Sequence, residues 1–579
     1  MNSQGTWQRS WLLALWLCFL AGGVRALDFT YTTANSNVTI TGYTGSGGDV
    51  TVPETIASLP VTAIGDFAFS QSTEVTSLHL PDSITTIGNW AFDYCIGLTN
   101  FIIPPNVSAI GDFAFISCPG LPQLTLPASV TAIGRGAFTG CTALTNIAAD
   151  AANPAYGDSD GVLFDKNSST LIAFPGGRAG SYTIPAHVTA IGDLAFSYCT
   201  GLTNLELPSG VITIGASAFD SCSGLTNLVI PASVTTIGKQ AFVSCTGLVS
   251  LAIPTGVTVI GAGTFGGCNN LTNITVPAGI TNIGPNAFGG CPKLTGLIIP
   301  SSVTAIGDHA FTACAGLKNL TLPSGITTIG DYTFANCTGL TNLVLPAGLT
   351  SIGTNSFAFC SGLTKVTLPP LVTTIGGYAF YSCTGLKNLV IPARVATIGD
   401  NAFALCSGLT NLSLSPGVMG IGHAAFSGCT RLTSLALPAS ITNIQDAAFF
   451  GCSQLAKVYF YGDAPAGNGT TTAFQNTVAT IYYLADTTGW QAHYGGRSTA
   501  LWVLPGSTTP GSPGIAGNQF GFSLTGSTNQ GVTVEACSSL AQADWTPVQS
   551  FILTNGTAYF RDSDWTNHLS RFYRVRSAP

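Results

Sequence analysis

The chain has 579 residues, of which only 7% are charged and 46% are hydrophobic, and its formal net charge is −7. An average soluble protein has about 25% charged residues, so this chain combines an unusually low charge with enough apolar residues for a large core. Such a composition excludes an intrinsically disordered chain. With 18 Lys and Arg against 25 Asp and Glu, and no basic run, it also argues against nucleic-acid binding.

Residues 1–26 have the three parts of a secretory signal peptide. Arg9 precedes an apolar run over residues 11–21, and residues 24–26 offer a cleavage site after Ala26. The run is shorter than the about 20 apolar residues of a membrane span, although an uncleaved anchor is the alternative. We expect a secreted or cell-surface protein with no transmembrane segment in the mature chain, and the periplasm is the alternative compartment.

Residues 27–60 are predicted to form an N-terminal cap. The segment contains short alternating runs such as VTITGY and GGDVTVP, which are typical of a hairpin. An open end of a repeat array would expose its core, so a covering element is needed there.

One unit of constant length is repeated sixteen times over residues 61–457. Ile-Gly occurs at Ile64, Ile87, Ile110 and Ile133, which sets a period of 23, and it recurs with this period from Ile191 to Ile421. Ile444 closes the series with Gln in place of Gly. Phe follows five residues after each Ile, and Cys follows three residues later in fifteen units. A fixed period in this range predicts a solenoid whose coils stack on one another.

The positions that carry Leu, Ile and Val in each unit predict two inward-facing walls. Phe101 and Ile103 lie two residues apart and therefore share one face of a strand, together with the preceding Leu98. Pro104 then ends the strand because it lacks an N–H donor. Ile110 is expected to make the second inward contact, on the opposite wall.

The segment after each Ile is expected to form a short helical turn. Gly111 is predicted to take a turn conformation that other residues avoid. Asp112 stands where a helix N-cap belongs, before Phe115 and Cys118. The predicted fold is therefore a solenoid that is mostly β, with short helical turns on its convex side.

The interval from Ile133 to Ile191 is longer than two repeats and shorter than three. Residues 148–184 contain alternating runs at 161–164 and 171–174. We expect one irregular long coil that bulges from the stack, without a domain break.

The repeat resembles the BspA-type leucine-rich repeat, a surface-protein variant of the leucine-rich repeat. The match rests on L-x-x-L-x-L followed by Pro-x-x-Val, with the Cys three residues before the first Leu. The resemblance covers about residues 38–460. It implies a leucine-rich-repeat solenoid that is exported and binds proteins or surfaces, and it implies no catalytic residues and no cofactor.

The fifteen repeat cysteines are interpreted as buried free thiols. Each occupies the same place in its coil, and no CxxC pair occurs. A metal site needs ligands that converge from different directions, which such a column does not supply. Occasional bridges between neighbouring coils are the alternative, and Cys537, outside the array, is predicted to be the more exposed thiol.

One column of Asn residues is the candidate binding face. These residues come five positions after the Cys, where a strand side chain points away from the core. The column comprises Asn100, Asn146, Asn204, Asn227, Asn273, Asn319, Asn342, Asn388 and Asn411. Two residues further on, the outward position carries hydroxyl and branched aliphatic side chains. The functional interpretation is a face for protein or glycan; the structural alternative is β-propensity with stacked side-chain amides.

Nothing in the sequence indicates catalysis or a metal. The six His residues are scattered, and no nucleophile elbow, HExxH or phosphate loop is present. Asp308 and Asp331 are one repeat apart and could hold a cation, although a capping role explains them as well.

The chain after the array divides into three parts. Residues 458–503 are predicted to be a C-terminal cap that uses Trp490, Tyr494 and Trp502 as core. Residues 504–518 are a Pro/Gly/Ser linker. Residues 519–579 show about five short alternating runs, which predict a small β-sandwich-like domain, and they resemble a module at the ends of many exported bacterial proteins.

These expectations define two functional hypotheses. The first is an adhesin-like secreted or cell-surface protein that binds an unidentified protein or glycan on a cell surface and performs no catalysis. The alternative is a structural spacer or surface-layer scaffold that presents the C-terminal module.

Overall fold

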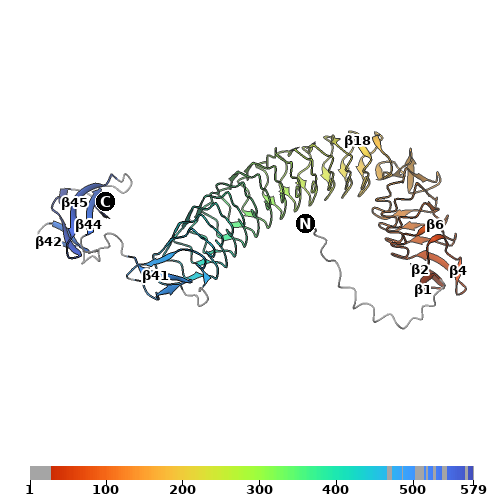
Figure 1. Ribbon diagram of the computed structural model, residues 1–579. Coiled ribbons are helices and arrows are strands. Elements are labelled where there is room, and N and C mark those ends of the chain that lie inside the picture. Colours follow the sequence, from red (N-terminus) through yellow and green to blue (C-terminus); the bar gives the residue numbers. More distant parts are fainter. Residues whose placement is uncertain are drawn as a thin grey trace. The chain divides into compact units, whose positions relative to one another are not determined.

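The computed structural model describes residues 28–465, 472–485, 487–502, 514–516, 519–525, 530–537, 544–567 and 571–577. The predicted signal peptide lies outside these ranges. The chain divides into two compact units, residues 1–386 and 387–579, which are described in turn. Within each unit the repeats stack coil upon coil (Figure 1).

The first unit begins with an antiparallel hairpin of β1 (Phe29–Ala34) and β2 (Asn37–Tyr43). β2 pairs in parallel with β5 (Leu59–Ile64), and the short β4 (Thr55–Ile56) pairs with β5 as well. The Phe29 ring lies 6.3 Å from that of Phe69 in the first coil. The hairpin therefore packs over the end of the core, as a cap must.

The coils of the first unit are joined by two ladders of short parallel strands. The Leu ladder contains the Asn-Leu-x-Leu residues. It comprises β3 (Gly48–Thr51), β6 (Val75–His79), β8 (Asn100–Phe101), β10 (Gln123–Leu126), β12 (Asn146–Ala149), β16 (Gly180–Thr183), β18 (Leu202–Glu206), β20 (Asn227–Leu228), β22 (Ser250–Ala252), β24 (Asn273–Thr275), β27 (Asn319–Thr321) and β29 (Asn342–Val344). Its register advances by one repeat, so that Asn204 faces Asn227.

The Ile ladder contains the residues before each Ile-Gly and forms the opposite wall. After β5 it comprises β7 (Thr86–Ile87), β9 (Ala109–Ile110), β11 (Ala132–Ile133), β15 (Thr170–Ala173), β17 (Ala190–Ile191), β19 (Thr213–Ile214), β21 (Thr236–Ile237), β23 (Val259–Ile260), β25 (Asn282–Ile283), β26 (Ala305–Ile306), β28 (Thr328–Ile329), β30 (Ser351–Ile352) and β31 (Thr374–Ile375).

The predicted inward positions of both walls are buried. Leu98 is fully buried, and Phe101, Ile103 and Ile110 are at most 7% exposed. Between the walls the Phe side chains form a column, in which Phe219 and Phe242 stack with 5.1 Å between ring centroids. The predicted solenoid and its core are thereby confirmed.

The segments after each Ile are not helical, which corrects the expected helical turns. No α-helix occurs in residues 61–457. Instead, the third and seventh residues after each repeat Ile have positive φ, for example Ser217 (52°) and Ser221 (59°). The N–H groups of Ser217, Phe219 and Ser221 donate to carbonyls of the next coil at 2.8–2.9 Å. Left-handed residues at these positions turn every second N–H toward the neighbouring coil, and these intercoil bonds offset their conformational cost.

The Ile-Gly glycines are required for close approach, not for a special φ. Gly111 does not have positive φ. A Cβ built on it would lie 2.5 Å from the Asn89 nitrogen and 2.6 Å from the Gly88 carbonyl carbon of the preceding coil. The expected turn conformation of Gly111 was wrong, because the coils approach too closely at this point for any side chain.

Where an Asp follows Ile-Gly, its side chain bonds to the next coil and does not cap a helix. Asp112 Oδ1 accepts from the Arg135 N–H at 2.7 Å, and Asp66 Oδ1 accepts from the Asn89 N–H at 2.7 Å. The carboxylate therefore supplies one further hydrogen bond between neighbouring coils.

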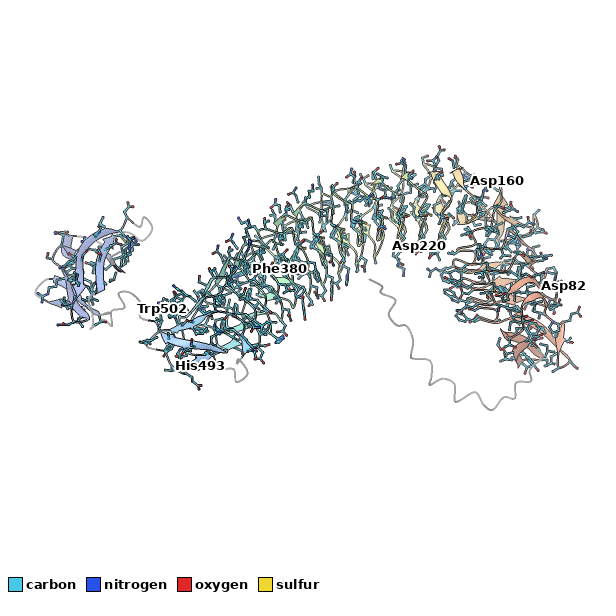
Figure 2. The ribbon with its side chains drawn as sticks, in the orientation of Figure 1. Asp82, Asp160, Asp220, Phe380, His493 and Trp502 are labelled. Carbon is cyan, nitrogen blue, oxygen red and sulfur yellow. The ribbon has the colours of Figure 1, made fainter. Side chains whose placement is uncertain are left out.

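The irregular insert forms a hairpin and a shortened coil. β13 (Tyr156–Ser159) and β14 (Val162–Asp165) pair antiparallel, and β14 pairs with β15, which joins β17 in parallel. Asp160, labelled in Figure 2, lies in the hairpin turn and forms an ion pair with Arg178 at 2.7 Å. Both ladders are interrupted here, since β11 and β12 each end their sheet.

The second unit contains the remaining coils and the end of the array. Its Leu ladder comprises β32 (Asn388–Ile391), β34 (Asn411–Leu414), β36 (Ser434–Leu437), β38 (Lys457–Phe460), β39 (Thr480–Tyr483) and β41 (Arg497–Leu501), the last paired with β40 (His493–Tyr494). Its Ile ladder comprises β33 (Thr397–Ile398), β35 (Gly420–Ile421) and β37 (Asn443–Ile444). Trp490 packs on Phe460 and Tyr483 with centroids 4.7 and 5.1 Å apart, and so closes this end of the core.

The C-terminal residues form two antiparallel three-stranded sheets around one core. One sheet has the order β42 (Gly514–Ala516), β43 (Gln519–Thr525) and β46 (Thr557–Asp562). The other has the order β45 (Thr546–Leu553), β44 (Gln530–Cys537) and β47 (Phe572–Ser577), and the short 3₁₀ helix η2 (Trp565–Asn567) follows β46. Residues 514–516 were assigned to the linker from composition, but they pair with β43 and belong to this domain.

Candidate binding face

The Leu ladder positions the Asn column by simple strand alternation. In β24 the side chains of Asn273 and Thr275 are exposed while Ile274 between them is buried. β27 and β29 repeat this pattern. The outward side chains of the Leu ladder in the first unit are called the strand face below.

Eight of the nine Asn side chains are exposed, and Asn146 is half-buried. The turn of the insert hairpin accounts for Asn146: the Ile147 N–H donates to the Gly161 carbonyl at 2.9 Å, and the turn lies so near that a Cβ built on Gly161 would clash with Asn146 Oδ1. The structure therefore brings Asn100, Asn204 and the four Asn residues from 227 to 342 to the strand face and covers Asn146. Asn388 and Asn411 are exposed on the second unit.

Stacking of amides explains only one pair in the column. Asn411 Nδ2 donates to Asn388 Oδ1 at 2.6 Å, and Asn100 Nδ2 donates to Ser77 Oγ at 3.4 Å. No other pair among the nine, all of which are described, is joined by an amide–amide hydrogen bond. On the strand face the amides are thus available to a partner.

Branched aliphatic side chains next to the Asn column are unusually exposed. Ile102, Val229 and Ile298 are 74%, 80% and 83% exposed. β-propensity explains branched residues at these positions, where Thr alternates with Ile and Val, but it does not account for the apolar ones on a solvated face. A row of exposed aliphatic and amide groups is the composition expected of a protein-contact surface.

The strand face is held rigid by hydrogen bonds from the preceding residue of each strand. Thr99 Oγ1 donates to the Thr76 carbonyl of the preceding coil, and Thr341 Oγ1 donates to the Lys318 carbonyl, each at 3.1 Å. A partner would therefore meet a surface that needs little ordering on binding.

A shallow hollow of about 440 Å³ lies on the strand face where the Asn column is interrupted. Lys365 occupies the Asn position there and forms a parallel bridge with Asn342. Val344 and Thr367 line the hollow beside them, and its floor includes Leu368 and Pro369. The hollow offers one cation and one amide above an apolar base.

The repeat cysteines are free and buried, and each thiol of the array for which a bond is described donates to a main-chain carbonyl. Cys245 Sγ donates to the Phe219 carbonyl at 3.0 Å, and Cys360 Sγ donates to that of Phe334 at 3.2 Å. Burial raises the pKa of both thiols to about 12. They are therefore protonated at neutral pH and serve as small core residues. Cys537, the last residue of β44, is also buried, at 6% exposed, so its expected exposure was wrong.

The paired Asp residues accept hydrogen bonds from the main chain of the next coil. Asp308 Oδ1 accepts from the Asp331 N–H at 2.9 Å, and Asp331 Oδ1 accepts from the Thr354 N–H at 2.7 Å. In the described part of the chain no three His, Cys, Asp or Glu side chains are placed to hold a metal ion. Within the same residues no helix has the length and hydropathy of a membrane span.

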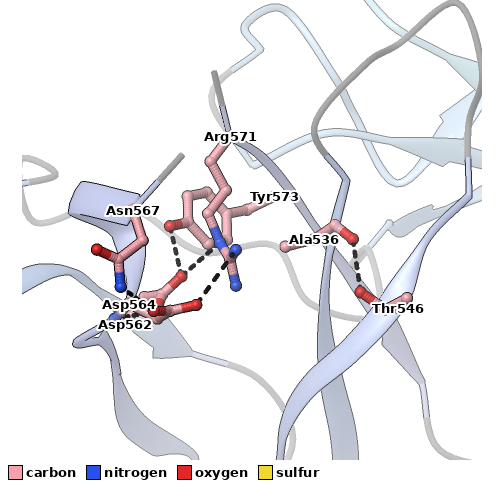
Figure 3. A network of polar contacts seen from close by, with 7 residues as sticks. All are labelled: Ala536, Thr546, Asp562, Asp564, Asn567, Arg571 and Tyr573. Carbon is pink, nitrogen blue, oxygen red and sulfur yellow. Dashed lines mark hydrogen bonds and ion pairs between the residues drawn. The ribbon is translucent and has the colours of Figure 1, made fainter. Parts of the chain in front are cut away.

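The C-terminal domain buries two acidic side chains with arginine partners. Asp562, 3% exposed, pairs with Arg571 at 2.7 Å and accepts from the Tyr573 hydroxyl at 2.8 Å (Figure 3). Burial, and the bond to this carboxylate, raise the pKa of Tyr573. Glu535, 5% exposed, pairs with Arg574 at 2.6 Å. Each of these two buried carboxylates is thus paired with a guanidinium.

One surface feature was not anticipated from the sequence. Phe67, Trp90 and Phe113 occupy the third position after successive repeat Ile residues, and their rings stack with centroids 6.1 and 4.5 Å apart. The repeat period places them in one column, which was the available signal. Because the rings cover one another's faces, the stack presents mainly ring edges to solvent.

The comparisons with known proteins concern the repeat array. A family model described as BspA type leucine rich repeat region matches residues 60–158, 172–295, 281–407 and 373–484. No curated protein matches the chain.

Several solved bacterial structures are similar. A leucine-rich cell surface protein of Faecalibacterium prausnitzii is 26% identical, with 68% of this chain and 95% of that chain covered and a TM-score of 0.39. A leucine-rich repeat protein of Bacteroides ovatus is 22% identical, with coverage of 82% and 98% and a TM-score of 0.38. The pneumococcal vaccine antigen PcpA is 17% identical, with coverage of 68% and 98% and a TM-score of 0.30.

Proposed function

The chain belongs to the BspA-type leucine-rich repeat family, and from this premise we propose that it is an exported, adhesin-like protein that binds a protein or glycan on a cell surface. Proteins with such repeats are typically bacterial surface or secreted proteins. The activity proposed is binding without catalysis, and the strand face is the proposed binding surface.

The exposure of Val229 and Ile298 is the observation that carries the proposal. Fully burying such a side chain stabilises by about 1.5–3 kcal/mol relative to leaving it in water. These side chains point away from the core and contribute little to the stability of the solenoid. Their apolar surface would be buried only against a partner. The hydrogen bonds of the Thr residues that directly precede Asn in the Leu ladder keep the surface ordered for that contact.

The Asn amides would supply orientation on the same surface. Each amide has a carbonyl acceptor and two N–H donors, so the row can bond both peptide groups and sugar hydroxyls. The hollow beside Lys365 would hold one side chain or sugar unit of the partner, with an acidic group favoured by the ammonium.

The binding proposal is tested by charged substitutions with a matched control. Val229→Asp combined with Ile298→Asp places two carboxylates on the strand face, whereas Ile212→Asp combined with Val259→Asp alters two exposed aliphatics on the other wall, 48% and 46% exposed. Adhesion of source cells that carry the strand-face variant should fall at least tenfold, and that of the control should not change. Equal adhesion of both variants would overturn the strand-face assignment.

The spacer alternative rests on the intercoil hydrogen bonds of the regular coils, which would also suit a rigid support for residues 519–579. In that case adhesion would survive the strand-face variant and would be lost on deletion of the C-terminal domain. Surface location is tested separately by fractionating source cells and treating intact cells with protease. Degradation of the array on intact cells supports surface display, and protection until the outer envelope is opened would place the protein in the periplasm.

A further inference from the structure

The insert interrupts the hydrogen bonds that join the turn segments, which are the residues after each repeat Ile, from one coil to the next. In the regular coils these segments are joined by N–H groups of the third, fifth and seventh residues after Ile, as for Ser217, Phe219 and Ser221. After Ile133 the corresponding N–H groups belong to Gly136, Phe138 and Gly140. In this fully described stretch no backbone or side-chain group accepts from these three N–H groups.

The cause is the shortened turn of the insert coil. Leu171 pairs with Ile191 as a repeat Ile would, but Phe174 follows it after three residues and not five. Phe174 donates to the Ala195 carbonyl at 2.7 Å, while nothing described in the insert reaches the Asp193 carbonyl. The coil therefore fills only part of the space between two full turns.

A cavity of about 160 Å³ occupies the remaining space. Its lining includes Gly136, Phe138, Phe174, Leu194 and Ser197. Ser197 is 4% exposed, and its hydroxyl makes no hydrogen bond, although it lines the cavity. A buried hydroxyl without a partner is uncommon and points to a missing ligand.

The polar groups of this cavity require a ligand that both donates and accepts. The lining offers the unpaired N–H groups of Gly136 and Phe138 from the coil before the insert, and the Asp193 carbonyl and the Ser197 hydroxyl from the coil after it. At the edge, Arg135 and Asp193 lie 3.5 Å apart and neutralise each other, so the site favours neither an anion nor a cation. Hydroxyl groups meet these requirements, because each can donate and accept.

The apolar lining and the size of the cavity narrow the choice further. Phe138, Phe174 and Leu194 provide a surface for C–H groups. A cavity of about 150 Å³ holds one benzene molecule, so this one of about 160 Å³ takes one six-membered ring, and the outer hydroxyl groups of a pyranose would extend toward the solvent-exposed edge at Arg135 and Asp193. We propose that the gap at the insert is a binding site for one neutral, pyranose-sized polyol, such as a monosaccharide or the terminal unit of a glycan. This site is independent of the strand face.

The test uses the full mature chain and a panel of neutral monosaccharides, observed by saturation-transfer NMR and titration calorimetry. At least one sugar should bind with one site per chain. Ser197→Ala should weaken its binding about fivefold, which corresponds to one neutral hydrogen bond, and Ser197→Leu should abolish binding by filling the cavity. Binding of the free sugar is compared with binding of the same sugar at the end of an oligosaccharide. This comparison shows whether the ligand is a free monosaccharide or the terminal unit of a glycan.

The matched control is Ser356→Ala. Ser356 is also fully buried and has no side-chain partner, but its coil keeps the complete ladder, with Phe357 donating to the Ala379 carbonyl at 2.8 Å. This variant should bind like the parent chain. If Ser197→Leu does not fold, amide hydrogen exchange of the unmodified chain tests the site instead. Bound sugar should slow exchange in residues 134–142, which contain the unpaired N–H groups. No saturable sugar, or unchanged affinity in both Ser197 variants, would overturn the proposal and leave the gap as a water-filled cavity.

Discussion

The thiol of Cys245 donates a hydrogen bond to the main-chain carbonyl of Phe219 in the preceding coil, with 3.0 Å between sulfur and oxygen. The same bond joins Cys95 to Phe69 near the start of the array and Cys452 to Phe426 near its end. Each thiol thus fills a small space beside the Phe column and satisfies a buried carbonyl with a weak donor. A column of reduced cysteines is therefore part of how the coils are joined.

The thiol column predicts resistance to labelling. In the native mature chain a maleimide reagent should modify almost none of the sixteen cysteines that are buried in the structure. In denaturant without reductant, all sixteen should react, because none is paired in a disulfide. Mass spectrometry of the two samples measures the difference. Fast native labelling of Cys245 or its neighbours would contradict the packing, and missing thiols in the denatured sample would indicate bridges.

The raised pKa values predict loss of stability in alkali. The thiols of Cys245 and Cys360 have an ordinary pKa of 9.0 and, in the folded coil, one of about 12. Between these values the unfolded chain has released protons that the folded chain retains, so unfolding becomes easier as pH rises. The stabilisation is complete below pH 9 and falls by about 1.4 kcal/mol per pH unit for each such thiol above it.

The measurement is the thermal midpoint from pH 7 to pH 11. The midpoint should stay level to about pH 9 and then fall, and Cys245→Ala should reduce the slope of that fall while lowering the midpoint at pH 7. A slope that is the same in the variant would show that this thiol titrates alike in both states.

The glycines of the Ile-Gly pairs predict a sharp contrast between two Gly→Ala substitutions. At Gly238 a Cβ would lie 2.5 Å from the Ala216 nitrogen and 2.6 Å from the Gly215 carbonyl carbon, both backbone atoms that cannot move aside locally. Gly238→Ala should therefore destabilise by about 1–3 kcal/mol, the usual cost of overpacking.

The matched control is Gly157→Ala in β13, where a Cβ would meet nothing within 4 Å. That change should be neutral or stabilise by up to about 1 kcal/mol through the unfolded state. Denaturant unfolding followed by circular dichroism compares the two. An equal loss of stability in both variants would show that the coils do not approach at Gly238 as described.

The repeat period was sufficient to predict the solenoid, its register and its buried walls, since a shift of one repeat leaves Leu98, Phe101 and Ile110 in equivalent places. It could not predict the turn segments. Trp90 has a φ of 57° although bulky residues avoid this region, and only the intercoil hydrogen bonds explain why it is held there. Local propensity cannot anticipate such a tertiary constraint.

The candidate face was predictable in position but not in accessibility. Strand alternation placed Asn146 and Asn227 equivalently, yet the insert hairpin covers Asn146 while Asn227 stays open. The cavity beside Ser197 could not be predicted from the sequence either, because it depends on a turn shortened by two residues within an irregular coil. Departures from the period are thus where the sequence was least informative.

The most direct test of the strand face is site-specific photocrosslinking on living source cells. Benzoylphenylalanine is introduced at Ile298, 83% exposed on the strand face, or at Val259, 46% exposed on the other wall. If the strand face is the binding surface, irradiation should give a discrete high-mass adduct from position 298 and none from position 259. Equal adducts from both positions would contradict this assignment of the binding surface. It would also be contradicted if neither position gave an adduct while the cells still adhered.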